Sequence, residues 1–266
     1  IIKIFISIEF KMDELLNKKN LNLLKELTLS NFKLRNEGSV LGIFWYLLNP
    51  LLMLIVLYFI FSKNIGSSIQ NYAFYVLIGV IQWNFFSSST SDGMLSFERY
   101  KELVKKVNFP RELLVISSVF NIFLSHLIEW GLLLILLIFI SGITYNLIFL
   151  PIILLLELIL SLTLSLILSV AISYYRDIEG IWKNVLFVGW FLTPIFYAKE
   201  IIPNKFSFIN IINPLSHIIT FARTILINNK QIDLLILSFI FLCLIILFIL
   251  SYIIFKKLVI NVAERI

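Results

Sequence analysis

The chain has 266 residues, of which 60% are hydrophobic and only 14% are charged, and its net charge is +6. A soluble globular domain carries about 25% charged residues, so this sequence has too few polar groups to cover its own surface in water. Composition therefore excludes a soluble enzyme, and no basic fold or motif supports a nucleic-acid partner. We expect a single all-α integral membrane domain over residues 1–266, in contact with membrane lipids.

Six apolar segments satisfy the length that a transmembrane helix needs, which is about 20 residues. They cover residues 43–61, 72–89, 113–140, 147–173, 181–197 and 232–255. The fifth is short and carries Lys183 and Asn184 near its start and Pro194 near its end. We expect this segment to bend or to continue as a re-entrant piece.

Lys and Arg residues are distributed unequally between the two sides of the membrane. Of the 22 in the chain, 17 lie before the first segment, between the second and third, between the fourth and fifth, or after the sixth, if Lys183 is counted among them. Because cytoplasmic loops are enriched in Lys and Arg, both termini are predicted to be cytoplasmic. The sequence thus predicts a multi-pass protein of the cytoplasmic (inner or plasma) membrane, with a cytoplasmic region 1–42, a six-span region 43–255 and a cytoplasmic tail 256–266.

The cytoplasmic stretch 11–35 has the pattern of an amphipathic helix. Leu16, Leu23, Leu27 and Leu34 recur at spacings that place them on one helical face. One interpretation is a helix that lies in the membrane interface, and the other is a soluble helix that packs on a partner subunit. The first span follows within a few residues, which favours the interfacial helix.

The loop between the second and third spans, 92–112, is the most highly charged internal segment. Its core at 97–109 reads FERYKELVKKVNF, in which Leu103, Val104 and Val107 interrupt the charges. This pattern predicts a short amphipathic helix that projects into the cytoplasm. The simpler alternative is a solvated turn anchored by basic residues.

Signatures of catalysis are missing from the sequence. It contains no GxxxxGK[ST] phosphate loop and no HExxH or GxSxG motif, and His126, His217 and Cys243 do not make a convincing metal site. We therefore expect neither a bound cofactor nor a metal, and no catalytic residue. A membrane-embedded enzyme that uses isolated acids stays as an alternative without a motif.

Three ionisable residues lie within predicted spans: His126 and Glu129 in the third and Glu157 in the fourth. Burying an Asp or Arg at the centre of a span costs about 2.5 to 3.5 kcal/mol on insertion scales, so such residues need a function or a partner. His126 and Glu129 share a helical face, and an antiparallel pairing of the two spans brings Glu157 to a similar depth. The cluster is either a proton relay or polar substrate contact, or a hydrogen-bonded group that fixes helix packing.

Four patches occur in a fixed order along the chain. They are LRNEGSVLGIFWYLLNPLLML at 34–54, NFPRELLVISS at 108–118, YYRD at 174–177, and TPIFY at 193–197 followed by Asn213, Pro214 and Arg223. Together, and at these topological positions, they resemble the permease subunits of ABC-2 type exporters that move polysaccharides, O-antigen or teichoic acids.

The resemblance implies a homodimer of six-span subunits, each with an N-terminal interface helix, a cytoplasmic coupling helix at 97–109 and short re-entrant outer helices in the loop 198–231. It also implies two copies of an ABC ATPase partner, which would bind ATP and Mg. The implied ATPase-coupling residues are Arg99, Tyr100, Lys101, Glu102, Lys105, Lys106, Arg176 and Asp177. Those implied for the substrate channel and gate are Trp45, Tyr46, Trp190, Pro194, Tyr197, Asn213, Pro214 and Arg223.

The leading hypothesis is therefore the permease of an ATP-driven exporter for a lipid-linked polysaccharide of the O-antigen, capsule or teichoic acid type. One alternative keeps the architecture and exports a drug or a small lipid. Another is a proton-coupled secondary transporter that uses His126, Glu129 and Glu157, although no inverted repeat is visible.

Overall fold

A computed structural model describes residues 17–37, 42, 44–63, 66–107, 109–141, 145–206, 208–228 and 230–265. Within these ranges the chain is helical and contains no strand. The α-helices are α2 (Lys18–Asn36), α3 (Phe44–Phe61), α4 (Tyr72–Met94), α5 (Ser96–Arg99), α6 (Lys101–Lys106), α7 (Glu112–Ser141), α8 (Leu150–Tyr174), α9 (Ile178–Leu192), α10 (Phe208–Ile212), α11 (Pro214–Leu226), α12 (Leu234–Leu258) and α13 (Val262–Arg265). Short 3-10 turns occupy Gly66–Ser68, Tyr145–Phe149, Lys199–Ile201, Asn204–Phe206 and Val259–Asn261.

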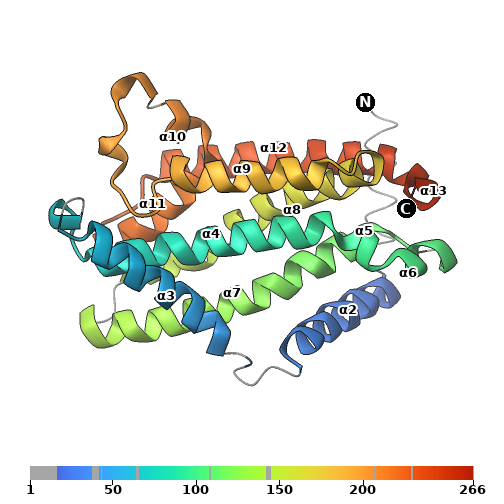
Figure 1. Ribbon diagram of the computed structural model, residues 1–266, viewed down its shortest axis with the longest axis horizontal. Helices are drawn as coiled ribbons and strands as arrows, with labels where there is room; N and C mark the ends of the chain where they lie inside the picture. Colours follow the sequence, from blue (N-terminus) through green and yellow to red (C-terminus); the bar gives the residue numbers. More distant parts are fainter. Residues whose placement is uncertain are drawn as a thin grey trace.

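The long helices form an elongated bundle (Figure 1). Helices α4, α7, α8, α9 and α12 run roughly along its long axis, and α4 and α8 form its centre. Helix α4 packs against α3, α7, α8, α9 and α11, which explains why most of its side chains are buried. Helices α5, α6 and α13 lie at one end of the bundle, and α10 and α11 lie toward the other end.

Four helices are long and apolar enough to cross a membrane: Phe44–Phe61, Glu112–Phe139, Asn146–Tyr174 and Leu234–Asn261. They coincide with the first, third, fourth and sixth segments that hydropathy predicts. Large apolar side chains such as Phe59, Phe139 and Leu235 are more than 80% exposed on them. Such a surface suits lipid and not water, so the chain is an integral membrane protein.

The second and fifth predicted segments are also helices, but neither is long and apolar enough by these criteria. In helix α4 the polar side chains of Gln82, Ser89 and Thr90 are completely buried. Neighbouring helices therefore shield these polar groups from lipid, so α4 does not need to be apolar throughout. Helix α9 has 15 residues and ends at Leu192, with Thr193 in an extended conformation. The end differs from the expected 197 because Pro194 has no N–H to continue the helix and disfavours a helical residue before it.

The charged loop also differs from the single helix that its pattern predicts. It folds into α5 and α6, which are separated by a bend at Tyr100. Phe97 and Val104 are buried, so the segment rests on the bundle and is not a free turn.

The predicted N-terminal amphipathic helix corresponds to α2, which packs along the N-terminal half of α7 (Figure 1). Leu27 contacts the core beneath α5 and α6, whereas Leu34 is 64% exposed. Leu16 lies outside the described residues, as do residues 142–144 of the turn between α7 and α8.

Helix α11 begins at a well-formed cap. The side-chain Oδ1 of Asn213 accepts hydrogen bonds from the backbone N–H groups of Leu215, at 3.1 Å, and Ser216, at 3.4 Å. Pro214 occupies the first helical turn, where its missing N–H costs nothing. The cap starts a short helix that packs against α4 and α8 inside the bundle.

Candidate functional site

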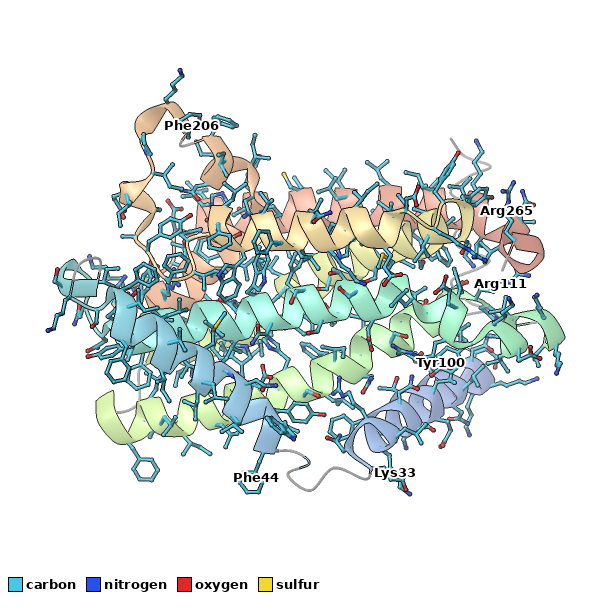
Figure 2. All side chains as sticks on the ribbon, in the orientation of Figure 1. Lys33, Phe44, Tyr100, Arg111, Phe206 and Arg265 are labelled. Atoms are coloured by element: carbon cyan, nitrogen blue, oxygen red, sulfur yellow. The ribbon has the colours of Figure 1, made fainter. Side chains whose placement is uncertain are left out.

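Most of the residues that the sequence singles out lie in three places. Figure 2 shows Tyr100, Arg111 and Arg265 near one end of the bundle, while Phe206 marks the opposite end and Phe44 lies on the side. The first end carries the predicted coupling residues. The opposite end carries most of the predicted gate residues, and the ionisable cluster lies between the two ends.

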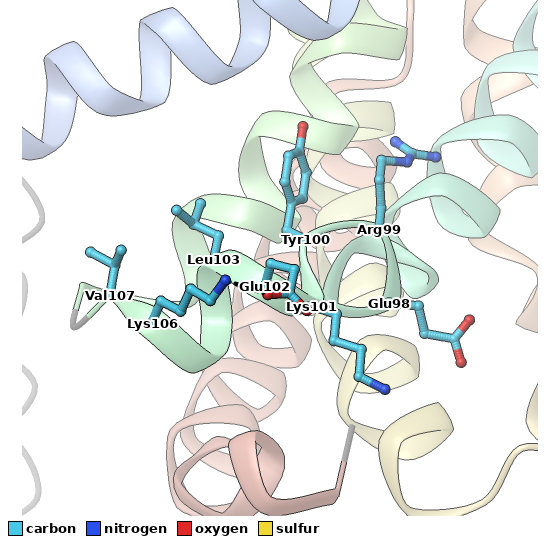
Figure 3. Close-up of a pocket in the computed structure, with 8 residues that line it drawn as sticks. All are labelled: Glu98, Arg99, Tyr100, Lys101, Glu102, Leu103, Lys106 and Val107. Atoms are coloured by element: carbon cyan, nitrogen blue, oxygen red, sulfur yellow. Dashed lines mark ion pairs between the residues drawn. The ribbon is translucent and has the colours of Figure 1, made fainter.

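Helices α5 and α6 present a charged surface beside a cavity of about 570 Å³ (Figure 3). Arg99 donates two hydrogen bonds to the carboxylate of Asp92, at 2.9 and 3.1 Å, and these bonds raise the pKa of Arg99. Lys106 pairs with Glu102 at 2.8 Å, and both side chains are about three-quarters exposed. Exposed pairs of this kind contribute little to stability, so both charges are available to a partner. Lys101 and Lys105 are exposed on the same segment.

The uncharged side of this segment is anchored to the bundle. The Phe97 ring stacks on Phe255 of α12 with centroids 6.1 Å apart. The Tyr100 hydroxyl donates to the side chain of Asn31 in α2, and burial raises the pKa of Tyr100. A displacement of α5 or α6 would therefore reach α2 and α12 directly.

Arg111, which precedes α7, and Glu112, which begins it, hold the C-terminal end of α12. The Nη1 group of Arg111 donates to the carbonyl oxygens of Val259, at 2.5 Å, and Ile260, at 3.2 Å. Glu112 is 1% exposed and forms an ion pair with Lys256. We call these five interacting residues the α7–α12 clamp. The NFPRE patch contributes to the family resemblance, but no role was predicted for Arg111 and Glu112, although an acidic residue in the first turn of a span was a usable signal.

Arg176 and Asp177 lie in the exposed turn between α8 and α9. Among the described residues, no hydrogen bond or ion pair joins them to α5 or α6. They therefore form a separate exposed charged turn.

Arg223 of α11 is 4% exposed and holds three segments together at the opposite end. Its guanidinium donates to the carbonyl oxygens of Pro194 at 2.6 Å, Ile195 at 2.6 Å, and Tyr75 at 2.9 and 3.1 Å. It also lies over the Tyr75 ring, 3.4 Å from the centroid. We call Arg223 with these partners the outer lock, because it joins α11 to α4 and to the loop after α9.

Tyrosine hydroxyls fasten the same loop further. Tyr72 and Tyr75 donate to the carbonyl oxygens of Phe196 and Tyr197, each at 2.9 Å. Asn213 donates from Nδ2 to the Thr193 hydroxyl at 2.9 Å. The four successive carbonyl oxygens of residues 194–197 thus have donors inside the protein, as irregular backbone at membrane depth requires.

Trp190, another predicted gate residue, packs edge-on against Trp83 with centroids 5.8 Å apart. The structure therefore brings Trp190, Pro194, Tyr197, Asn213, Pro214 and Arg223 into one region. Trp45 and Tyr46, which begin α3, do not join them. Trp45 is 42% exposed, and Tyr46 lines a polar cavity with Arg35.

His126 joins the two acids in the middle of the bundle. Its Nε2 lies 3.1 Å from Oε2 of Glu157, and its Nδ1 lies 3.8 Å from Oε2 of Glu129. Trp130 donates its indole N–H to Nε2 at 2.8 Å. Because an indole N–H can only donate, Nε2 acts as an acceptor, and Glu157 fits beside it when its carboxyl group carries a proton. His126 and Glu157 are at most 1% exposed.

Three features together define a polytopic membrane protein. They are the long helices with exposed apolar side chains, the short helix α11 packed inside the bundle, and an irregular loop whose carbonyl oxygens accept hydrogen bonds from the protein itself. Residues 22–227 match the family model described as ABC-2 type transporter. The chain therefore belongs to the ABC-2 type transporter family. It is a transport subunit, as the sequence predicts, and not an enzyme.

Curated relatives extend this similarity. Two proteins of Klebsiella pneumoniae, each described as O-antigen export system permease protein RfbA, are 31% and 32% identical over 211 residues, which cover 78% of this chain and 81% of each relative. A Myxococcus xanthus protein of the same description is 27% identical over 214 residues, covering 79% of this chain and 82% of the relative. The resemblance drawn from the four sequence patches is thereby confirmed.

Proposed function

We propose that the chain is the permease subunit of an ATP-driven exporter that moves a lipid-linked polysaccharide out across the cytoplasmic membrane. The observation that carries this proposal is the similarity, over about four-fifths of both chains, to relatives described as O-antigen export permeases. These relatives favour a polysaccharide over a drug or a small lipid as cargo. Membership of the ABC-2 family counts against a proton-coupled transporter.

In this proposal α4 and α9 complete a set of six spans within one domain, with both termini in the cytoplasm. At 1.5 Å per residue, α4 is about 34 Å long, which matches a hydrocarbon core of about 30 Å. Helix α9 is about 22 Å long, so the loop after it covers the remaining depth. Arg223 keeps that loop folded, which supports a re-entrant arrangement of α11 at the outer gate.

Two copies of an ABC ATPase would supply the energy and would hold ATP and Mg, and this chain would bind no cofactor itself. The proposed docking surface comprises Arg99, Tyr100, Lys101, Glu102, Lys105 and Lys106, with Arg176 and Asp177 as a second contact. The exposure of its charges and the burial of Phe97 support this assignment, because a coupling element needs both a free face and a fixed one.

We further propose that two copies of the chain associate through α3 and α9. None of the side chains of α9 is buried, and α3 exposes Leu52, Ile55 and Phe59. In such a dimer Trp45, Tyr46 and Trp190 would lie near the substrate path. Sugar rings would stack on aromatic faces there.

Measurement of ATP hydrolysis by the partner ATPase, with and without this chain in nanodiscs, tests the coupling proposal. We expect the wild-type chain to stimulate hydrolysis, and Arg99→Ala and Glu102→Ala to reduce this stimulation. Lys205→Ala, an exposed charge change in the loop between α9 and α11, serves as the control. Stimulation that is unchanged in both coupling variants would refute the docking surface.

A further inference from the structure

A polar cavity of about 350 Å³ lies on the side of the bundle, between the end of α2, the start of α3, and the middle of α4 and α7. We call it the lateral cavity. Its size falls within the roughly 300 to 1,000 Å³ of small-molecule sites. It lies apart from the outer lock and from the α7–α12 clamp, and neither feature uses its residues.

Most side chains of the lateral cavity carry hydrogen-bonding groups. They include Arg35, Tyr46, Asn84, Ser88, Ser125 and Glu129. Four of the contributing residues lie in the middle of α4 and α7, where a lipid environment would make unpaired polar groups costly. Polar side chains in such a place indicate a polar ligand or water.

The rim of the cavity is held in place by a hydrogen-bond network. Arg35 donates from Nε to the Tyr46 hydroxyl at 3.1 Å, and from Nη2 to the Asn121 carbonyl at 3.4 Å and to the Ser125 hydroxyl. The Tyr46 hydroxyl in turn donates to the side chain of Asn36 at 2.8 Å. These contacts fix two large side chains before any ligand arrives, which lowers the entropic cost of binding.

His126 lines the inner part of the cavity with an unused donor. Its Nε2 accepts from Trp130, so in the neutral ring the proton lies on Nδ1. That Nδ1 atom is buried and makes no hydrogen bond, since Glu129 at 3.8 Å is too distant. A buried donor without an acceptor is destabilising, and a ligand hydroxyl in the cavity would relieve it.

We propose that the lateral cavity binds one sugar ring of the polymer, an inference that rests on the proposed function. Sugar hydroxyls both donate and accept, and the amide of Asn84 and the hydroxyls of Ser88 and Ser125 do the same. The charges of Arg35 and Glu129 offset each other, which suits an uncharged ligand better than a phosphate. An acyl chain would leave these polar groups unpaired. The partly exposed aromatic ring of Tyr46 supplies a surface for the C–H face of the sugar, whereas Phe85 is buried with its ring stacked on His126.

Cysteine protection tests the site. Cys243 is the single native cysteine, so Cys243→Ala gives a background in which Ser88→Cys is the only thiol. The probes are an oligosaccharide cut without its lipid from the surface polysaccharide of the producing strain, and inorganic pyrophosphate. We expect the oligosaccharide to slow maleimide labelling of Ser88→Cys in nanodiscs by at least about threefold, and pyrophosphate to leave the rate unchanged.

Ser87→Cys is the matched control, because Ser87 is the adjacent residue on α4, does not line the cavity and bonds to the Asn84 carbonyl of its own helix. Its labelling rate should not respond to either probe. Adding Asn84→Leu, which removes the amide at similar volume, should abolish the protection of Ser88→Cys.

Protection by pyrophosphate alone would overturn the proposal in favour of an anion site. Equal labelling of Ser88→Cys with and without the oligosaccharide would leave a water-filled cavity and would also overturn it. Export by the wild-type chain is measured in parallel. If the wild-type chain exports polymer and no protection is seen, the sugar site fails while the proposed function stands.

Discussion

The guanidinium of Arg223 lies so close to Gly79 that a Cβ at position 79 would stand 2.6 Å from its Nη2 atom and 2.9 Å from the Ile195 carbonyl oxygen. Only glycine leaves room for this approach, because real Cβ contacts are not that short. Gly79 on α4 and Arg223 on α11 therefore form two halves of one contact. Through it the loop after α9 is held against the centre of the bundle.

We expect Gly79→Ala to weaken the outer lock. The added methyl group must displace backbone or the buried guanidinium, and overpacking of this kind costs about 1 to 3 kcal/mol. The thermal transition of the purified protein in detergent should fall. Gly131→Ala on α7 is the control, because nothing lies within 4 Å of its added Cβ. Equal thermal transition temperatures for Gly79→Ala and Gly131→Ala would contradict the close packing at Gly79.

Arg223→Gln should also lower the thermal transition, because it leaves the carbonyl oxygens of Pro194 and Ile195 without donors. Each unpaired buried group costs about 1 to 3 kcal/mol. When Arg223→Gln is combined with Gly79→Ala, the loss of stability should be smaller than the sum of the two single losses, because the shorter Gln side chain leaves space for the added methyl group. Strict additivity in this double-mutant cycle would mean that the two positions do not interact.

Reversal of the buried ion pair tests the α7–α12 clamp. Glu112→Lys and Lys256→Glu each leave like charges together, and breaking a buried pair costs about 3 to 5 kcal/mol. The double variant should recover part of the thermal transition and part of the stimulated ATPase activity. Lys257→Glu, an exposed change one residue away, should have little effect. A double variant no better than either single one would refute the direct pairing.

Glu157→Gln should be tolerated, whereas Glu157→Leu should not. A Gln amide can donate to Nε2 of His126 as a protonated carboxyl group does, and Leu cannot. Export by Glu129→Gln with Glu157→Gln would indicate that the cluster fixes helix packing. Loss of export in a stably folded double variant would instead favour a proton relay.

Hydropathy and spacing predicted a large part of this structure. Four of the six predicted spans are confirmed as long apolar helices, because lipid-facing helices need continuous apolar surface. The common depth of Glu129 and Glu157 followed from the antiparallel pairing of their helices, and the structure places both beside His126. Helix α4 is less apolar than these four helices, because other helices and not lipid surround most of its side chains.

The outer lock could not be read from the sequence. All of its hydrogen-bond acceptors are backbone carbonyl oxygens, which leave no residue-type signal, and they come from α4 and from the loop after α9. Arg223 was named from the sequence as a gate residue, but only by resemblance and without its partners. An isolated glycine in an apolar run, Gly79, was the single available hint of close packing.

The lateral cavity escaped prediction for a related reason. Arg35 and Asn84 are 49 residues apart in the sequence, and no periodic pattern connects the end of α2 with the middle of α4. Trp45 and Tyr46 were grouped with the outer gate by resemblance, whereas Tyr46 lies in the cavity with Arg35. Tertiary packing alone brings these residues together.

The central claim is that this chain exports a polysaccharide with energy from ATP. Its most direct test measures the polymer that enters inverted membrane vesicles containing the chain and its partner ATPase. We predict that transport requires ATP, persists when a protonophore removes the proton gradient, and stops when this chain is omitted. Transport that continues without ATP and is abolished by the protonophore would contradict the account.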